Sequence, residues 1–301
     1  NADGSPQINP NAPLYSEKGF STEPEYRETD YYLMDGYNDN NYPDVTPERD
    51  GKRLIVQPNT FNMYCHREPR FYLTVVWNGQ WFKWENRNTN FLYGGPDGGP
   101  THDAPQNGYL NRSRVSLDYI PRDNNHPYRP AIIFRMAEAY LSYAEALNEC
   151  SERMSYEQEI LNNLNKIRHR AGIAEYGTGT DENGFTRIKI NFADQKEVRR
   201  LIHKERRVEF VGEGIRYHDL RRWKTAHYGI GNMNEQGENP DWGVNGPDHG
   251  MNYYGTEYTD QGDNAFFKRT KYMDRVYPRK FYWYPIHQSE IDKDPTLVQG
   301  P

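Results

Sequence analysis

The 301-residue sequence has no apolar run long enough for a membrane-spanning helix, which needs about 20 consecutive apolar residues. Basic runs are also missing, and the formal net charge is −6, which argues against nucleic acid as a partner. Only two cysteines are present, Cys65 and Cys150. This excludes a disulfide scaffold and is compatible with one bridge or with two free thiols.

Motifs for metal-dependent and nucleophilic chemistry are absent from the sequence. His203 has no second histidine at the spacing of a zinc helix, and no Cys-x-x-Cys pair occurs. There is no Gly-x-Ser-x-Gly elbow and no phosphate-binding loop. Residues 35–44 are rich in Asn and Asp but lack the spacing of a calcium loop. We therefore expect no metal and no cofactor.

The sequence is instead rich in turn formers and aromatics, with 25 Tyr, 25 Gly and 20 Pro. This composition predicts long irregular connections between a minority of regular elements. We expect a mainly helical fold with long loops and a small β-hairpin. Within one domain, the regions are a hairpin and loop part (about 1–129), a helical core (about 130–224), and a long loop with a tail (225–301).

The clearest strand pattern lies at residues 71–84, where apolar side chains alternate around an Asn-Gly pair at 78–79. Asn-Gly is the commonest two-residue hairpin turn. The predicted register pairs Val75 with Phe82 on the core side. It turns Trp81 toward the opposite, more exposed face.

Two helices are predicted in the middle of the chain, from Ile132 to about Glu149 and from about 156 to 171, with Gly172 following the second at its C′ position. Together they resemble a tetratricopeptide-type helical hairpin, although one such hairpin is too few for a solenoid. The apolar face predicted for the first helix consists of Ile133, Met136, Tyr140, Ala144 and Leu147.

A third helix begins after Asp194, a good N-cap residue, with Glu197 placed as its partner in a capping box. Its predicted apolar face is formed by Val198, Leu201, Ile202, Val208 and Val211. Gly212 and Gly214 end it, and residues 215–223 form a second, shorter helix.

Acidic residues fall close to this apolar face. Glu205 and Glu209 lie one turn apart, and a carboxylate near a buried surface needs a partner. Arg206, Arg216 and Arg222 are the nearest cations in sequence. We predict a structural ion-pair network that consists of Glu205, Arg206, Glu209, Glu213, Arg216, Asp219, Arg222, Arg135 and Glu138.

The alternative is a glycan-degrading enzyme that uses two of these acids as a catalytic pair. Glu205 with Glu209, or Glu213 with Asp219, could meet the roughly 5–10 Å separation that glycosidases require. However, each acid has an arginine within about one turn in sequence, which favours ionised, structural pairing. We therefore predict that the chain is not an enzyme.

Several segments resemble the signature motifs of the SusD/RagB family of surface glycan-binding lipoproteins. The most distinctive is Glu-Arg-Arg at 205–207, followed by Glu-Gly-Ile-Arg-Tyr-His-Asp-Leu-Arg-Arg-Trp at 213–223. Glu-Pro-Arg-Phe-Tyr at 68–72 resembles the family's Asp-Pro-Arg-Phe-Tyr. Residues 135–141 and 164–172 resemble further family motifs, in the family's order.

The resemblance implies a SusD-like fold and a non-catalytic role in polysaccharide utilisation in Bacteroidetes. Such a protein would bind an oligosaccharide or another nutrient at the cell surface and deliver it to a SusC-like TonB-dependent transporter in the outer membrane. Family members carry an N-terminal lipid anchor and a helical N-terminal half. Neither is found in this chain, so we interpret it as the C-terminal region of such a protein.

Aromatic side chains are the expected ligand contacts, because a sugar ring stacks its C–H face on a flat aromatic ring while polar groups bond its hydroxyls. The candidates are Trp81, Tyr93, Tyr37 and Tyr42. A second alternative is a tetratricopeptide-like protein–protein adaptor, which would bind a peptide or protein partner and ignore sugars.

Overall fold

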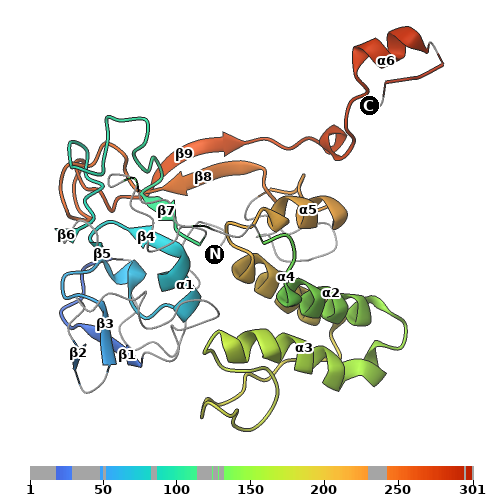
Figure 1. The fold of residues 1–301 in the computed structure, drawn as a ribbon, viewed down its shortest axis with the longest axis horizontal. Coiled ribbons are helices and arrows are strands. Elements are labelled where there is room, and N and C mark those ends of the chain that lie inside the picture. The colour runs from blue at the N-terminus through green and yellow to red at the C-terminus, as the bar shows by residue number, and fades with distance from the viewer. Residues whose placement is uncertain are drawn as a thin grey trace. The chain divides into compact units, whose positions relative to one another are not determined.

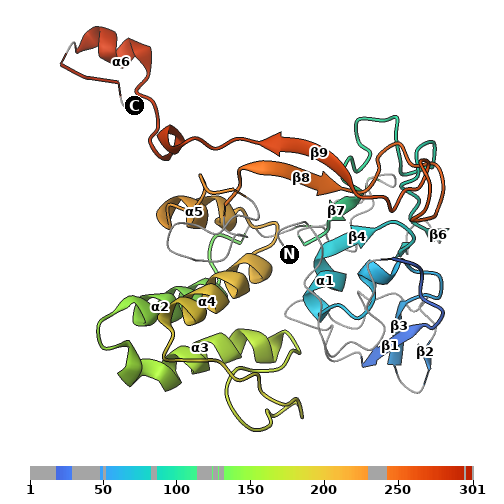
Figure 2. The same ribbon diagram turned by 180° about the vertical axis from the view of Figure 1, so that it is seen from behind.

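The computed structural model describes residues 18–28, 48–49, 52–82, 87–113, 124, 128, 132–229, 243–294 and 296–299. The chain forms two compact units. The larger consists of Pro6–Glu213 and Gly250–Thr270, and the smaller of Asn1–Ser5, Gly214–His249 and Lys271–Pro301. Each unit is described below by itself (Figures 1 and 2).

The first part of the larger unit contains short strands around an aromatic core. Its elements are β1 Glu25–Glu28, β2 Glu48–Arg49, β3 Lys52–Val56, α1 Pro69–Thr74, β4 Val75–Trp77, β5 Trp81–Phe82, β6 Arg87–Asn88 and β7 Tyr109–Asn111, with a 3₁₀ turn at Asn62–Tyr64. The strand order of the first sheet is β1-β3-β2, and β4 pairs with β7 and β5 with β6, all antiparallel.

The core of this part is built from aromatic rings contributed by distant segments. Phe61 stacks on Phe267 with ring centroids 4.5 Å apart, and Phe71 stacks on Trp77 at 5.5 Å. Phe266 and Met251 are buried in the same cluster. Loop residues 251–267 therefore complete a core whose other members come from the first hundred residues.

The hairpin predicted at residues 71–84 is not formed in that register. Residues 69–74 are helical, β4 pairs with β7 with Val76 opposite Leu110, and β5 pairs with β6. The turn at Asn78 and Gly79 does form, since the N–H of Gln80 donates to the carbonyl of Trp77 (3.2 Å) and Gly79 has φ +91°. The pairing of β4 with the distant β7 therefore replaces the hairpin that the Asn-Gly turn predicts. The small antiparallel pair in this region is β5 with β6.

The second part of the larger unit is a bundle of three helices, α2 Met136–Glu149, α3 Glu157–Arg170 and α4 Gln195–Glu209. Helix α2 packs against both α3 and α4, as Figures 1 and 2 show. A 3₁₀ turn at Arg153–Tyr156 connects α2 to α3. Side chains fully buried between these helices are Leu141, Ala144, Ile160, Leu164, Ile167, Val198 and Ile202.

Helix α2 begins later than predicted. Residues 132–135 precede it, and Arg135 is its N-cap with an extended backbone (φ −140°, ψ 153°). Ile133 and Met136, which were expected in the core, are 97% and 57% exposed. The buried face is instead set by Ala137, Leu141 and Ala144, so only Ala144 of the expected face is fully buried.

The other helix ends follow their local signals. Asp194 caps α4, and its side chain accepts hydrogen bonds from the N–H groups of Lys196 (2.9 Å) and Glu197 (3.3 Å). The reciprocal half of the capping box is not formed as expected, because the Glu197 carboxylate accepts instead from the N–H of Asn191 (3.4 Å). Gly172 follows the end of α3 with φ +62°, as the C′ position requires.

On α4, Val198, Leu201 and Ile202 are buried as predicted, while Val211, beyond the helix end, is 38% exposed. The predicted apolar face therefore covers the first half of the helix, and buried Glu205 and Glu209 continue it.

The smaller unit contains α5 Ile215–Arg222, β8 Gly246–Gly250, β9 Thr270–Arg275, a 3₁₀ turn at Arg279–Tyr282, and α6 Gln288–Lys293. The two strands pair with each other and end at the boundary of the unit. Arg221 of α5 is held by residues that follow β9: it donates hydrogen bonds to the hydroxyl of Tyr277 (3.0 Å) and to the carbonyl of Tyr282 (2.7 Å).

Cys65 and Cys150 are both free thiols, which settles the alternative that the sequence left open. Burial raises the pKa of the Cys65 thiol to about 12. Among the described residues, no helix is both long and apolar enough to cross a membrane. Within the same residues, no group of three or more His, Cys, Asp or Glu side chains could hold a metal ion.

The N-cap of α4 can be tested by mutation. Asp194→Ala removes the acceptor of two helix N–H groups, so we expect the free energy of unfolding to fall by about 0.5–2 kcal/mol. Urea unfolding followed by circular dichroism measures this change. Asp194→Asn, which retains a capping oxygen, should stay close to the parent, and an Ala variant as stable as the parent would contradict the assignment.

Candidate functional site

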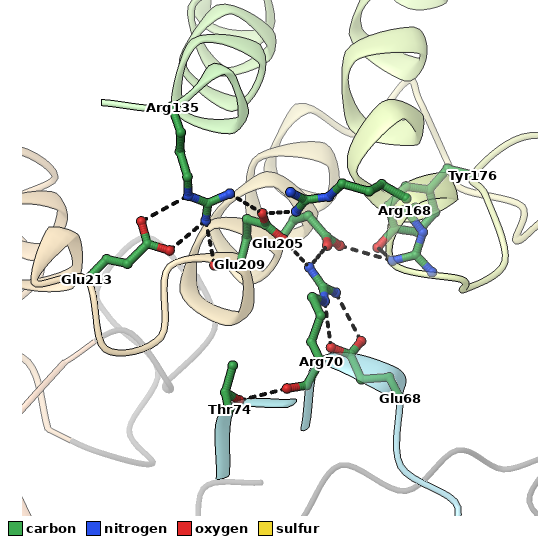
Figure 3. Close-up of polar contacts among 10 residues, drawn as sticks. Glu68, Arg70, Thr74, Arg135, Arg168, Tyr176, Glu205, Glu209 and Glu213 are labelled. Atoms are coloured by element: carbon green, nitrogen blue, oxygen red, sulfur yellow. Dashed lines mark hydrogen bonds and ion pairs between the residues drawn. The ribbon is translucent and has the colours of Figure 1, made fainter. Parts of the chain in front are cut away.

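Two carboxylates of α4 are buried, and both are fully paired with arginines. Glu205 is 3% exposed and Glu209 is 7% exposed. One oxygen of Glu205 accepts a hydrogen bond from Nη1 of Arg70 (2.7 Å), and the other accepts from Nη1 of Arg168 (3.0 Å). Figure 3 shows both guanidinium groups pointing at this carboxylate from different elements.

Glu209 lies one turn further along and contacts three arginines. Its Oε2 accepts from Nη1 of Arg70 (2.9 Å), and its Oε1 accepts from Arg135 and from Arg170. One guanidinium, that of Arg70, therefore bridges the two buried acids. This arrangement satisfies the demand that a buried charge be paired and hydrogen-bonded.

Two outer carboxylates complete the cluster. Glu213 forms a bidentate pair with Arg135, to Nε (2.9 Å) and Nη2 (2.7 Å), and the same Nη2 donates to the carbonyl of Glu209 (2.8 Å). Glu68 forms a bidentate pair with Arg70 (2.8 and 3.0 Å). We call these eight side chains the arginine–glutamate cluster, and its members are Glu68, Arg70, Arg135, Arg168, Arg170, Glu205, Glu209 and Glu213.

Of the arginines predicted for the network, Arg135 is a member of the cluster, whereas Arg206 makes other contacts. Arg206 was expected beside Glu205, but neighbouring residues of a helix point about 100° apart. Arg206 instead turns toward α2, where it donates to the hydroxyl of Ser142 (3.0 Å) and lies 3.9 Å from a carboxylate oxygen of Glu145.

The remaining predicted members of the network lie elsewhere. Asp219 and Arg222 pair within α5 of the smaller unit, with Arg222 Nε 2.9 Å from a carboxylate oxygen of Asp219. Arg216 is half-buried in the first turn of the same helix. Glu138 is half-buried in the first turn of α2, where its backbone N–H donates to the carbonyl of Arg135 (2.9 Å).

Sequence reasoning did not find Arg70, Arg168 and Arg170 as partners of the acids. All three lie in segments that resemble family motifs, 68–72 and 164–172, so the signal was present. The spacing of residues in the sequence could not reveal the packing that brings residues 37 to 139 positions apart into contact.

Electrostatics favour the charged forms of Glu209 and Arg70. Burial alone would raise the pKa of Glu209, but Arg170, Arg70 and Arg135 outweigh it, and the pKa is lowered. Burial disfavours the charged form of Arg70, yet the carboxylates of Glu205 and Glu68 outweigh this effect and raise its pKa. A general acid of a glycosidase needs a raised carboxyl pKa. Glu209 has the opposite shift, so it is unsuited to that role.

Of the four aromatic ligand candidates, Tyr37 and Tyr42 lie outside the described residues. Trp81 is half-buried in β5. Its indole Nε1 is shielded from solvent and has no hydrogen-bond partner among the described residues. Only part of the Trp81 ring is therefore available to a ligand.

Tyr93 lies in a more open setting. It is half-buried and contacts two tyrosines of the 251–266 loop, Tyr253 at 5.9 Å and Tyr254 at 5.6 Å between ring centroids. Tyr254 is 70% exposed. The sequence placed Tyr253 and Tyr254 in a long loop but gave no reason to join them to Tyr93.

Comparison with known proteins places these motifs in a family. Residues 6–301 match the SusD family model. The SusD-like protein P25 of Formosa agariphila is 35% identical over 109 residues, which is 36% of this chain and 18% of that protein.

Solved structures show the same fold. A SusD-like protein from Bacteroides fragilis has a TM-score of 0.56 and 26% identity, over 90% of this chain and 45% of that one. The protein BT4246 has a TM-score of 0.56 and 22% identity, over 91% of this chain and 40% of that one. The predicted SusD-like fold is thus confirmed, and the chain spans less than half the length of these relatives.

The arginine–glutamate cluster is expected to carry much of the stability of the larger unit. Arg70→Met removes one guanidinium from three carboxylates and leaves buried charge uncompensated, so we expect the free energy of unfolding to fall by about 3–5 kcal/mol. Urea unfolding measures it. The matched control is Lys268→Met, which breaks an exposed pair with Asp263 in the same unit and should cost less than about 1 kcal/mol. Equal effects of the two variants would contradict a structural role for Arg70.

The lowered pKa of Glu209 predicts a pH dependence. A carboxyl whose folded pKa lies below its unfolded value, near 4.5, contributes stability that is fully present above pH 4.5 and is lost as the pH falls through the folded pKa. The stability difference between the parent and Glu209→Gln should therefore be largest at pH 7 and shrink at pH 3. Urea midpoints at pH 7, 5, 4 and 3 test this, and a difference that stays constant would be inconsistent with it.

Proposed function

The chain belongs to the SusD family, and on that premise we propose that it binds an oligosaccharide at the cell surface and delivers it to a transporter without breaking a bond. The geometric observation that carries the non-catalytic part is the pairing of Glu205, Glu209 and Glu213. Each of these carboxylates is bonded by at least one guanidinium. A hydrolase would need a carboxyl group free to give up or accept a proton.

Ligand contact is assigned to aromatic side chains. Tyr93 is the first contact that we propose among the described residues, because its neighbour Tyr254 is exposed. Trp81 is the second, because its indole Nε1 is shielded from solvent. Tyr37 and Tyr42 are proposed as further contacts from sequence alone. Few ring contacts suit a ligand that must be released, since each stacking interaction adds only a modest free energy.

Delivery requires a partner and a location. We propose that the full-length protein sits at the outer face of the outer membrane through an N-terminal lipid anchor. There it would cap a SusC-like TonB-dependent transporter that imports the bound ligand. This part of the proposal rests on family membership. No contact among the described residues favours the adaptor or the enzyme alternative. The experiment below distinguishes both from the proposed function.

The proposed function is tested by measuring whether the chain binds oligosaccharides and whether it hydrolyses them. The purified chain is offered a panel of plant, algal and bacterial oligosaccharides on an array. Hits are titrated by calorimetry, and the same mixtures are incubated overnight and analysed for released sugars. We expect a dissociation constant in the micromolar to millimolar range and no product.

The outcomes are distinct. Released sugar that disappears in a Glu205→Gln or Glu213→Gln variant that remains folded by circular dichroism would establish hydrolysis. Binding of peptides with no binding of any sugar up to millimolar concentration would support the adaptor. Either result would overturn the proposed function.

A further inference from the structure

Two loops of the larger unit bring three tyrosine rings together. Tyr93 belongs to the loop after β6, and Tyr253 and Tyr254 follow β8. Ring centroids lie 5.9 Å apart for Tyr93 and Tyr253, 5.6 Å for Tyr93 and Tyr254, and 5.1 Å for Tyr253 and Tyr254. We call this group the tyrosine platform.

The backbone beneath the platform is fixed by hydrogen bonds. The N–H of Tyr93 donates to the carbonyl of Gly255 (2.8 Å), which joins the two loops directly. The Asn252 side chain accepts from the N–H of Tyr254 (3.2 Å) and donates to the carbonyl of Ala265 (3.1 Å). The rings are therefore carried on an ordered scaffold, which lowers the entropy cost of binding.

Glycine at position 99 allows the rings to approach each other. A Cβ atom on Gly99 would lie 2.6 Å from the ring carbon Cζ of Tyr253 and 3.0 Å from a ring carbon of Tyr93. Such distances are below van der Waals contact. The loop backbone passes directly beside the rings, where any larger residue would separate them.

The three rings differ in exposure, which gives the platform one open face. Tyr254 is 70% exposed, whereas Tyr93 and Tyr253 are half-buried beside it. The hydroxyl of Tyr253 donates to the carbonyl of Thr101 (3.4 Å), and His102 and Asp103 follow with side chains 93% and 85% exposed. An open ring beside exposed polar groups suits a sugar, whose C–H face stacks while its hydroxyls are bonded.

Charge around the platform selects the kind of sugar. Segments 93–109 and 251–269 carry five acidic residues and two basic residues, Lys268 and Arg269. Lys268 pairs with Asp263 (2.9 Å), and Arg87 from β6 pairs with Asp97. The loops thus present net negative charge, and a glycan that carries carboxylates or sulfates would be repelled.

We infer that the tyrosine platform of Tyr93, Tyr253 and Tyr254 is a binding subsite for a neutral pyranose of an oligosaccharide chain, with the Tyr254 ring as the stacking surface. This inference rests on the proposed function and names its site and its ligand class. The subsite uses two residues, Tyr253 and Tyr254, that sequence reasoning did not assign.

The experiment titrates the intact chain by calorimetry with neutral hexasaccharides (cellohexaose, xylohexaose, mannohexaose, laminarihexaose and maltohexaose) and with an anionic one, hexagalacturonate. The best neutral ligand is then measured against Tyr254→Ala, Tyr254→Phe and the matched control Tyr143→Ala. Tyr143 is an exposed tyrosine of α2 (47%), outside the platform. We expect at least about tenfold weaker binding for Tyr254→Ala, and less than about threefold for the other two variants. Hexagalacturonate should bind more weakly than the best neutral ligand.

Three other outcomes would contradict either the subsite or the proposed function. If a neutral hexasaccharide binds the parent and Tyr254→Ala equally, the platform is not the subsite, while the proposed function stands. If hexagalacturonate binds best, the assignment to neutral sugars is wrong. If neither these ligands nor any glycan on the array binds the parent, the proposed function itself fails. Circular dichroism of Tyr254→Ala tests whether that variant keeps its fold. Retained binding by Tyr254→Phe, which keeps the ring, assigns the contact to the ring and not to the hydroxyl.

Discussion

The larger unit depends on the pairing of two buried carboxylates, Glu205 and Glu209, with arginines from three other segments. Arg70 enters from α1, Arg135 from the start of α2, and Arg168 and Arg170 from the end of α3. Removing either acid from water costs several kcal/mol unless its hydrogen-bonding capacity is met. Because these four arginines come from three different stretches of chain, the pairing is satisfied only when all of these segments meet. The cluster therefore specifies how they assemble.

This requirement also explains where some elements begin. Arg135 is extended, and its guanidinium reaches both Glu209 and Glu213. The α2 helix starts only after it, leaving Ile133 in solvent. On the other side, Pro69 at the first helical turn starts α1, and the carbonyl of Arg70 accepts from the hydroxyl of Thr74 (2.7 Å), as Figure 3 shows. Residues 69–74 are therefore helical despite their alternating apolar pattern. In this helix the Arg70 side chain reaches Glu205 and Glu209.

Sequence therefore predicts the fold best where the determining interaction is local. The cap at Asp194, the glycine after α3 and the break between α4 and α5 depend on neighbours within a few residues, and each lies where it was expected. The pairing of β4 with β7 joins residues more than thirty positions apart, and a strong Asn-Gly turn could not reveal it. For the same reason Glu205 and Glu209 could be found from their position on α4, whereas their partners Arg70, Arg168 and Arg170 could not.

The same distinction bears on function. The carboxylates of the cluster are paired with guanidinium groups, so they are poorly suited to act as catalytic acids or bases. The cluster contributes rigidity instead. Loops held by such a scaffold can present binding groups in fixed positions. The tyrosine platform fits this division, because its rings lie on loops whose backbones bond to each other, at Tyr93 and Gly255. Divergence within such a fold would then change the rings that the loops carry. The cluster would change less readily, since loss of any one of its arginines removes a charged hydrogen-bond partner from a buried carboxylate.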